Sequence, residues 1–212
     1  ALGMLLMLLN NLKRADNEVR NGVWKRSENR GYEIAGRTIG IVGYGNMGAA
    51  FAKYLQGFDC EVLVYDKYKI GFGNEFIKES SLYEIYEKAD IVSIHLPLTE
   101  ETHYYINDDF ISCCKKNIYI INTARGKCLN TADLVKHMKT GKVIGACLDV
   151  LEYESTSFES IDTTTLPEPM QYLLKSEQVI LSPHIAGWTH ESNYKMSKII
   201  ADKMISVLSV RA

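Results

Sequence analysis

Residues 36–66 read GRTIGIVGYGNMGAAFAKYLQGFDCEVLVYD, and the order of elements that this stretch predicts decides the fold. The apolar run at residues 38–42 has the length and composition of a strand that is buried on both faces. A glycine-rich loop follows at once, and residues 49–55 then predict a helix whose N-terminus faces that loop. A second strand at residues 61–65 ends at Asp66. This order indicates an α/β fold.

The three glycines of the loop occur in the spacing Gly-x-Gly-x-x-Gly. Gly43 permits a tight turn, Gly45 lets the backbone approach a pyrophosphate, and Gly48 lets the helix pack close to the strand. The free N–H groups of the helix N-terminus add an anion site, and Asp66 is placed to accept from both ribose hydroxyls of an adenosine. For the glycines alone, an ordinary turn is the alternative. Because strand, loop, helix, strand and acid occur in order, we predict a dinucleotide-binding site.

The chain of 212 residues is long enough for one large domain or two small ones. Its apolar fraction of 46% and charged fraction of 24% are ordinary for a globular protein, and its net charge of −2 gives no electrostatic footprint for nucleic acid. The five cysteines are odd in number, and none has the spacing of a zinc site. We interpret them as small apolar side chains in a reducing, cytoplasmic environment, and we expect no metal site.

The first nine residues are apolar, but this run is far shorter than the ~20 residues that a membrane span needs. No basic region precedes it, so neither a signal peptide nor a membrane partner is expected. Leucines at helical spacing predict one amphipathic helix that runs to about Val19. This helix begins mid-way through its apolar pattern, so we expect that residues upstream are missing. Trp24 is expected to pack as the anchor of the irregular segment that follows.

Strands and helices alternate through the rest of the chain. Strands are expected at residues 89–96, 117–121, 143–148 and 178–181, and helices at residues 80–86, 109–115, 130–139 and 191–210. The charged residues 67–73 are expected to be a solvated loop, and the acidic residues 151–177, which contain two prolines, a long loop. The alternation predicts a Rossmann-type doubly wound parallel sheet with helices on both faces.

Polar side chains collect at or just after the expected strand ends. In such a sheet ligands bind outside the carboxyl ends of the strands, so Asp66, His95, Arg125, Asp149 and His184 should meet at one edge. A guanidinium at Arg125 can hold a carboxylate by a two-point contact, and a neutral imidazole at His184 can exchange a proton with an alcohol. A structural ion pair and a structural histidine are the alternatives for these two residues. His95 is expected to have a structural or cofactor-lining role.

Five motifs in this order resemble those of the D-isomer-specific 2-hydroxyacid dehydrogenases, over residues 5–207. They are the glycine loop at residues 36–48, IHLPLT at residues 94–99, NTARG at residues 122–126, LDVLEYE at residues 148–154 and SPHIAG at residues 182–187. The sequence departs from the family's pattern at Ser155, where proline is usual, and at Trp188, where a small residue is common. The substrate domain that precedes this stretch in the family is absent from the chain.

The resemblance implies a catalytic set in which Arg125 binds the substrate carboxylate and His184 takes the hydroxyl proton. Glu154 would pair with His184 and favour its protonated form. From the residues alone, a solvated loop charge is the better interpretation of Glu154. The implied NAD site consists of Gly43, Gly45, Asn46, Met47, Gly48, Asp66, Leu96, Pro97, Thr123, Ala124, Asp149 and Gly187. Asn46 and Met47 would meet the pyrophosphate, and Asp149 would hold the nicotinamide carboxamide.

The resemblance further implies hydride transfer between NAD(H) and a small-molecule 2-hydroxy acid or 2-keto acid, with 3-phosphoglycerate as a candidate substrate. Residues 1–187 would form the NAD-binding domain, including a linking helix at residues 1–20. Residues 188–212 would return toward the absent substrate domain. A homodimer through the NAD-binding domain is also implied, with the leucine-rich first helix as the candidate contact. The alternative is a non-catalytic, NAD-sensing binding module.

Overall fold

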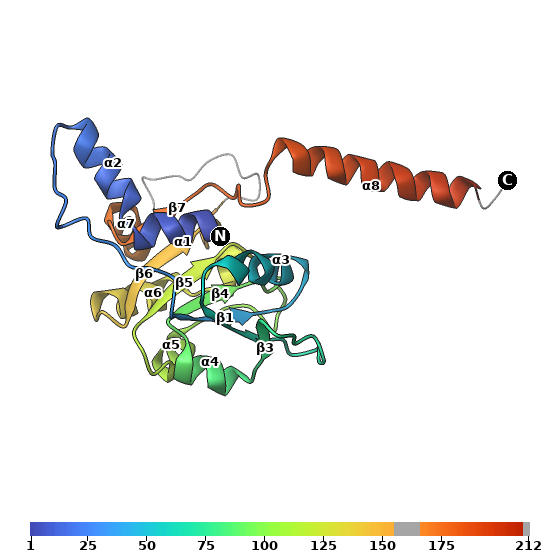
Figure 1. The fold of residues 1–212 in the computed structure, drawn as a ribbon, viewed down its shortest axis with the longest axis horizontal. Helices are drawn as coiled ribbons and strands as arrows, with labels where there is room; N and C mark the ends of the chain where they lie inside the picture. The colour runs from blue at the N-terminus through green and yellow to red at the C-terminus, as the bar shows by residue number, and fades with distance from the viewer. Residues whose placement is uncertain (155–165, 210–212) are drawn as a thin grey trace.

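A computed structural model describes residues 1–154 and 166–209. Its seven strands form one parallel sheet in the order β3-β2-β1-β4-β5-β6-β7 (Figure 1). The strands are β1 (Thr38–Val42), β2 (Glu61–Tyr65), β3 (Ile77–Glu79), β4 (Ile91–Ile94), β5 (Ile118–Asn122), β6 (Val143–Leu148) and β7 (Val179–Leu181). The chain enters at β1 and winds outward in both directions, which confirms the predicted doubly wound sheet.

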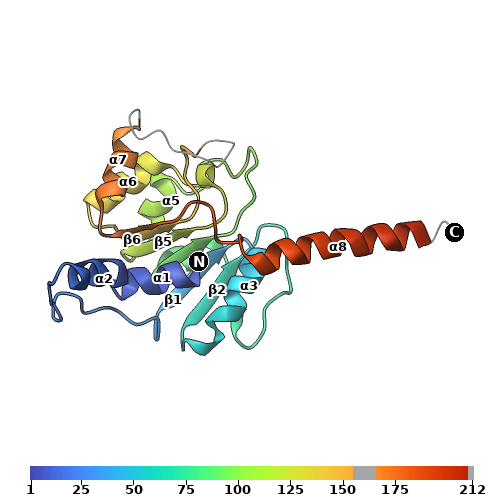
Figure 2. The same ribbon diagram turned by 90° about the horizontal axis from the view of Figure 1, so that it is seen from above.

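Helices cover both faces of the sheet. They are α1 (Leu2–Leu9), α2 (Leu12–Arg20), α3 (Asn46–Tyr54), α4 (Leu82–Lys88), α5 (Asp108–Cys113), α6 (Thr131–Lys139), α7 (Glu168–Lys175) and α8 (His190–Ser209), with short 3-10 turns η1 (Leu55–Gly57) and η2 (Gly126–Cys128). Apolar side chains of α1 and α3 pack on one face, and those of α4 to α7 pack on the other. Figure 2 shows α1 and α3 on one side of the sheet and α5, α6 and α7 on the other. Burial on both faces explains why the strands are apolar throughout rather than alternating.

The prediction of a single N-terminal helix is wrong, because the helix is interrupted between α1, which ends at Leu9, and α2, which begins at Leu12. Asn11 has a φ of 53° in the left-handed region, which asparagine tolerates better than most residues. The side chains of Leu5, Leu8 and Leu9 are buried in the core of this chain, whereas α2 has no buried residue and projects from the body (Figure 1). Trp24 beyond it is 82% exposed, so the prediction that it packs as an anchor is also wrong.

Two elements were missed by the sequence prediction. The expected long loop contains α7, whose Met170 and Leu173 are buried against the α6 side of the core. Pro167 is its N-cap, and Pro169 lies in its first turn, where a missing N–H costs nothing. Residues 155–165 of that expected loop lie outside the described residues. The three-residue edge strand β3 is too short to show a periodic pattern.

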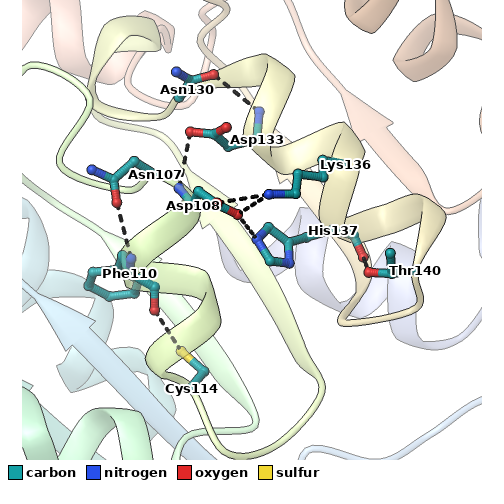
Figure 3. A network of polar contacts seen from close by, with 9 residues as sticks. All are labelled: Asn107, Asp108, Phe110, Cys114, Asn130, Asp133, Lys136, His137 and Thr140. Carbon is teal, nitrogen blue, oxygen red and sulfur yellow. Dashed lines mark hydrogen bonds and ion pairs between the residues drawn. The ribbon is translucent and has the colours of Figure 1, made fainter.

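Side-chain caps fix the starts of α4, α5 and α6. Ser81 forms a capping box with Glu84 at α4. Asn130 caps α6, and Asp108 at the start of α5 pairs with both Lys136 and His137 of α6. Figure 3 shows this network, in which one carboxylate joins two helices that lie next to each other on the sheet.

The closing helix α8 extends away from the sheet, and none of its described residues is buried (Figures 1 and 2). Its bounds agree with the predicted helix as far as the described chain reaches. Within residues 1–154 and 166–209, no helix has the length and apolar content that crossing a bilayer requires.

Candidate active site

The carboxyl ends of the strands lie at one edge of the sheet, and a cavity of about 550 Å³ opens there. Its walls come from the glycine loop after β1, the turn after β2 and the long loop after β4. The lining residues are Gly43, Gly45, Tyr65, Asp66, Lys67, Tyr68, His95, Leu96, Pro97, Thr99, Glu100, Glu101, Thr102 and Tyr105. Several predicted cofactor residues therefore share one cavity.

The glycine loop has the geometry that its spacing predicts. Gly43 has a φ of +97°, and a Cβ atom there would lie 2.6 Å from the His95 carbonyl oxygen. A Cβ atom on Gly48 would collide with the carbonyl oxygen of Gly43, so only glycine lets α3 start this close to β1. Gly45 has nothing within 4 Å of the Cβ position, and Asn46 and Met47 after it are exposed. The open backbone at the start of α3 fits an anionic group such as a pyrophosphate.

The Asp66 carboxylate holds the turn that follows β2. It accepts hydrogen bonds from the backbone N–H groups of Tyr44 at 2.7 Å and of Tyr68 and Lys69 at 2.9 Å. Burial alone would raise the pKa of Asp66, but these three donors outweigh it and lower the pKa below its usual value. A carboxylate has about four acceptor positions, so one is left for a ribose hydroxyl. The expected contact with both hydroxyls stays a prediction.

His95 lines the cavity from the end of β4, together with Leu96 and Pro97. Its ring packs on Phe51 with centroids 5.4 Å apart, and its Nε2 lies 2.9 Å from Ser93 Oγ. Burial lowers the pKa of His95 to about 4, so the ring is neutral near pH 7. A neutral, packed ring agrees with the expected structural or cofactor-lining role.

The loop after β5 presents Arg125 to solvent at the same edge. The buried Asn122 side chain donates to the Arg125 carbonyl oxygen at 3.0 Å and accepts from the Ala124 N–H at 3.1 Å. Ala124 is buried and Thr123 is half-buried. Asn122 therefore fixes the backbone that carries Arg125, a role that the sequence analysis did not assign.

The turn after β7 is built on Asp149, which is 1% exposed at the end of β6. The Asp149 carboxylate accepts from the Ile185 N–H at 2.9 Å, the Ala186 N–H at 2.8 Å and the Ser182 hydroxyl. The His184 N–H donates to the Asp149 carbonyl oxygen at 2.7 Å, and His184 has a φ of +57°. Asp149 thus holds the backbone on both sides of His184, whereas the carboxamide contact implied for it stays a prediction.

The structure brings His184 and Glu154 together. His184 Nδ1 lies 3.4 Å from Glu154 Oε1, and both side chains are less than a third exposed. Glu152, two residues earlier, is turned elsewhere, because its carboxylate accepts from the Tyr104 hydroxyl and from the Thr131 N–H at 3.0 Å. Of the two acids in the segment LDVLEYE, Glu154 is the one that faces His184.

Gly187 is exposed after this turn, and its carbonyl oxygen accepts from Ser192 of α8. Lys67 and Tyr68 are exposed, as the sequence predicts for this loop, and they also contact Glu101 across the cavity. No local pattern reveals this contact or the one between Tyr104 and Glu152, since each joins segments more than thirty residues apart. Throughout the described ranges, no group of three or more histidine, cysteine, aspartate or glutamate residues is placed to hold a metal ion.

Comparisons with known proteins agree with this geometry. Residues 2–186 match the family model described as D-isomer specific 2-hydroxyacid dehydrogenase, NAD binding domain. A glyoxylate reductase of Thermofilum pendens is 39% identical over 214 residues, which cover 98% of this chain and 60% of the relative. A D-lactate dehydrogenase of Aquifex aeolicus, solved with NAD and lactic acid, aligns with a TM-score of 0.82 at 31% identity, over 98% of this chain and 64% of that one.

A D-isomer specific 2-hydroxyacid dehydrogenase of Lactobacillus delbrueckii ssp. bulgaricus, solved in its NAD complex, aligns with a TM-score of 0.86 at 28% identity, over 98% of this chain and 64% of that one. The chain thus spans about 60% of the length of the curated relatives that it matches. Three findings identify NAD as the cofactor. They are the glycine loop at residues 43–48 (the glycine cradle), the acid Asp66 after β2, and the match to the family model. This chain belongs to the D-isomer-specific 2-hydroxyacid dehydrogenase family, as an NAD-binding domain.

Proposed function

We propose that the whole protein is an NAD-dependent 2-hydroxyacid dehydrogenase, which interconverts a 2-hydroxy acid and its 2-keto acid. The observation that carries this proposal is the His184–Glu154 pair at 3.4 Å, at the sheet edge that also carries the glycine cradle and Arg125. This reaction requires three things at one edge of the sheet: a proton-exchanging pair, a cation that binds a carboxylate, and a dinucleotide site.

His184 acts as the base when the alcohol is oxidised and as the acid when the keto acid is reduced. The Glu154 carboxylate, 3.4 Å from His184 Nδ1, orients the ring for this proton exchange. Arg125 holds the substrate carboxylate by a two-point contact. When NAD(H) is bound, its nicotinamide ring supplies the hydride chemistry, and the protein supplies position and proton transfer.

For the cofactor, we assign Gly45, Asn46 and Met47 to the pyrophosphate, because the start of α3 is open there. Leu96 and Pro97 line the cavity wall. We assign Thr123, Ala124 and Gly187 to the nicotinamide end, because they follow β5 and β7 at the same edge of the sheet. Asp66 repels a 2′-phosphate and leaves one acceptor position for a free hydroxyl, so NAD(H) is preferred over NADP(H).

The two parts of the chain have different tasks in this proposal. Residues 1–187 form the NAD-binding domain, and residues 188–212 return toward a substrate domain. The exposure of α8 supports this division, since a helix with exposed apolar residues such as Ile200 and Leu208 needs a partner surface. Because the matched relatives are longer than this chain, the substrate-selecting residues lie largely outside it.

The experiment is a turnover screen of the full-length protein with NADH and glyoxylate, hydroxypyruvate, pyruvate or 3-phosphohydroxypyruvate, the last testing the 3-phosphoglycerate candidate. Reduction of at least one substrate that is lost in His184→Ala but kept in His190→Ala supports the proposal, because His190 is an exposed histidine at the start of α8. NADH binding without turnover of any 2-keto acid would favour the NAD-sensing binding module instead.

We also propose a homodimer through this domain, but not through the leucines first expected to form it. Leu5, Leu8 and Leu9 pack in the core of their own chain, whereas α2 projects from the body, and Val19 within it and Val23 and Trp24 after it are exposed. An exposed tryptophan beside aliphatic side chains is typical of an interface anchor. Trp24→Ala in the full-length protein should weaken the dimer, as measured by light scattering, and an unchanged mass would count against this surface.

A cytoplasmic location is the remaining part of the proposal. All five cysteines are free thiols, and Cys113 is exposed. The other four are buried, and Cys147 lies in the core as expected. Free thiols at this density favour a reducing compartment.

A further inference from the structure

One contact in the cavity wall joins the ends of two strands. Lys67 and Tyr68 follow β2, and Glu101 lies in the loop after β4. One carboxylate oxygen of Glu101 pairs with the Lys67 ammonium group, and the other accepts a hydrogen bond of 2.6 Å from the Tyr68 hydroxyl. Since β2 and β4 lie on either side of β1, the contact bridges the walls that flank the glycine loop.

The position of Lys67 in this bridge is fixed by its neighbour. Asp66 accepts from the N–H groups of Tyr68 and Lys69, so the turn that carries Lys67 cannot swing freely. The Lys69 ammonium group is engaged with the Tyr44 carbonyl oxygen at 2.8 Å. Lys67 is therefore the cation that this turn presents to the cavity, and Glu101 is its partner.

A lysine at this position has a consequence for the cofactor. A cation next to the acid after β2 attracts the 2′-phosphate of NADP and so works against the selection that Asp66 makes. The hydrogen bond to Lys67 lowers the pKa of Glu101, and the same bond raises the pKa of Lys67, so both groups stay charged near pH 7. The lysine charge is thereby matched by a carboxylate in the same wall.

We propose that Glu101 is a second determinant of the preference for NAD over NADP, acting as a positioning residue that holds Lys67 and cancels its charge. This inference rests on the proposed NAD-dependent function. Exposed ion pairs contribute little to folding stability, so the effect belongs in cofactor discrimination rather than in the melting temperature.

The test measures the ratio of dissociation constants, Kd for NADPH over Kd for NADH, by calorimetry on the full-length protein. Glu101→Gln keeps the shape and an acceptor for Tyr68 but removes the charge, and it should lower this ratio by about five- to tenfold. Adding Lys67→Met to Glu101→Gln should restore most of the ratio, because the freed cation is then gone. The matched control is Glu100→Gln, which removes an equal charge from the same cavity wall but not from the ion pair.

Three results on the variants would overturn the inference. A ratio within twofold of wild type in Glu101→Gln overturns the inference, and so does a double variant that keeps the lowered ratio. An equal effect of Glu100→Gln also overturns it, because the net charge of the cavity rather than the pair would then decide. A wild-type protein that binds neither dinucleotide overturns the proposed function together with the inference, whereas an NADH-binding protein with an unchanged ratio overturns the inference alone.

Discussion

Gly126 lies directly against the carbonyl group of Leu151. A Cβ atom on Gly126 would overlap that carbonyl and would lie 2.6 Å from the Glu152 N–H nitrogen. The loop that carries Arg125 therefore packs backbone to backbone on the segment that leads to Glu154. The absence of a side chain at Gly126 therefore fixes the positions of Arg125 and Glu154, two residues of the proposed catalytic set, relative to each other.

Gly126→Ala should separate these two segments, because neither backbone has room to yield. We expect a loss of about 1–3 kcal/mol in the free energy of unfolding and a fall in kcat of about a hundredfold, since small misplacements of reacting groups are costly. Chemical denaturation and steady-state kinetics of the full-length protein measure both. Gly57→Ala is the control, because nothing lies within 4 Å of its Cβ position; equal effects of the two variants would refute the explanation.

Asn122→Asp tests the buried amide beneath Arg125. Aspartate keeps an acceptor for the Ala124 N–H but cannot donate to the Arg125 carbonyl oxygen, which retains the Cys128 N–H at 3.1 Å but loses the side-chain amide that positions it. We expect a rise in KM for the keto acid, because Arg125 is no longer oriented, and a loss of about 1–3 kcal/mol in stability. The exposed Asn193→Asp should change neither quantity. An unchanged KM would show that Arg125 does not depend on Asn122.

Glu154→Gln tests the proton-exchanging pair. The amide keeps the shape but removes the carboxylate that lies 3.4 Å from His184 Nδ1. The kcat for keto-acid reduction should therefore fall about tenfold to a hundredfold, because the imidazole loses the partner that orients it. Glu152→Gln should leave kcat unchanged, because Glu152 is engaged with Tyr104 and Thr131. If Glu152→Gln had the larger effect and Glu154→Gln had none, Glu152 rather than Glu154 would be the partner of His184.

His95 should make the fold sensitive to acid. Its pKa falls from 6.5 to about 4 on folding. Between about pH 4 and pH 6.5 the ring is therefore protonated in the unfolded chain but neutral in the folded protein. Stability should decline from about pH 6.5 and level off below about pH 4, by roughly 3 kcal/mol for this group. Denaturation of His95→Gln at pH 7 and pH 4.5 should show a smaller decline than wild type. The exposed His103→Gln is the control, and identical declines in all three proteins would contradict the assignment.

The sequence by itself determined the sheet and the edge at which the site lies. The strand before Gly43, the loop to Gly48 and the acid at Asp66 follow from local geometry, because turn conformation and strand periodicity depend on neighbouring residues. Once parallel strands were expected, the topology required Arg125, Asp149 and His184 to meet at one edge. The structure confirms each of these strand-end positions.

Only the tertiary structure decided which side chains meet at that edge. The family resemblance singled out Glu154, but the local pattern could not distinguish it from Glu152. Both lie in a segment without a period, and the orientation of Glu152 depends on Tyr104, 48 residues away. Burial of Leu5 and exposure of Trp24 likewise depend on which surface of the sheet lies beneath them. The contact between Lys67 and Glu101 exists because β2 and β4 flank β1, an arrangement set by strand order and the winding of the chain rather than by either residue's neighbours.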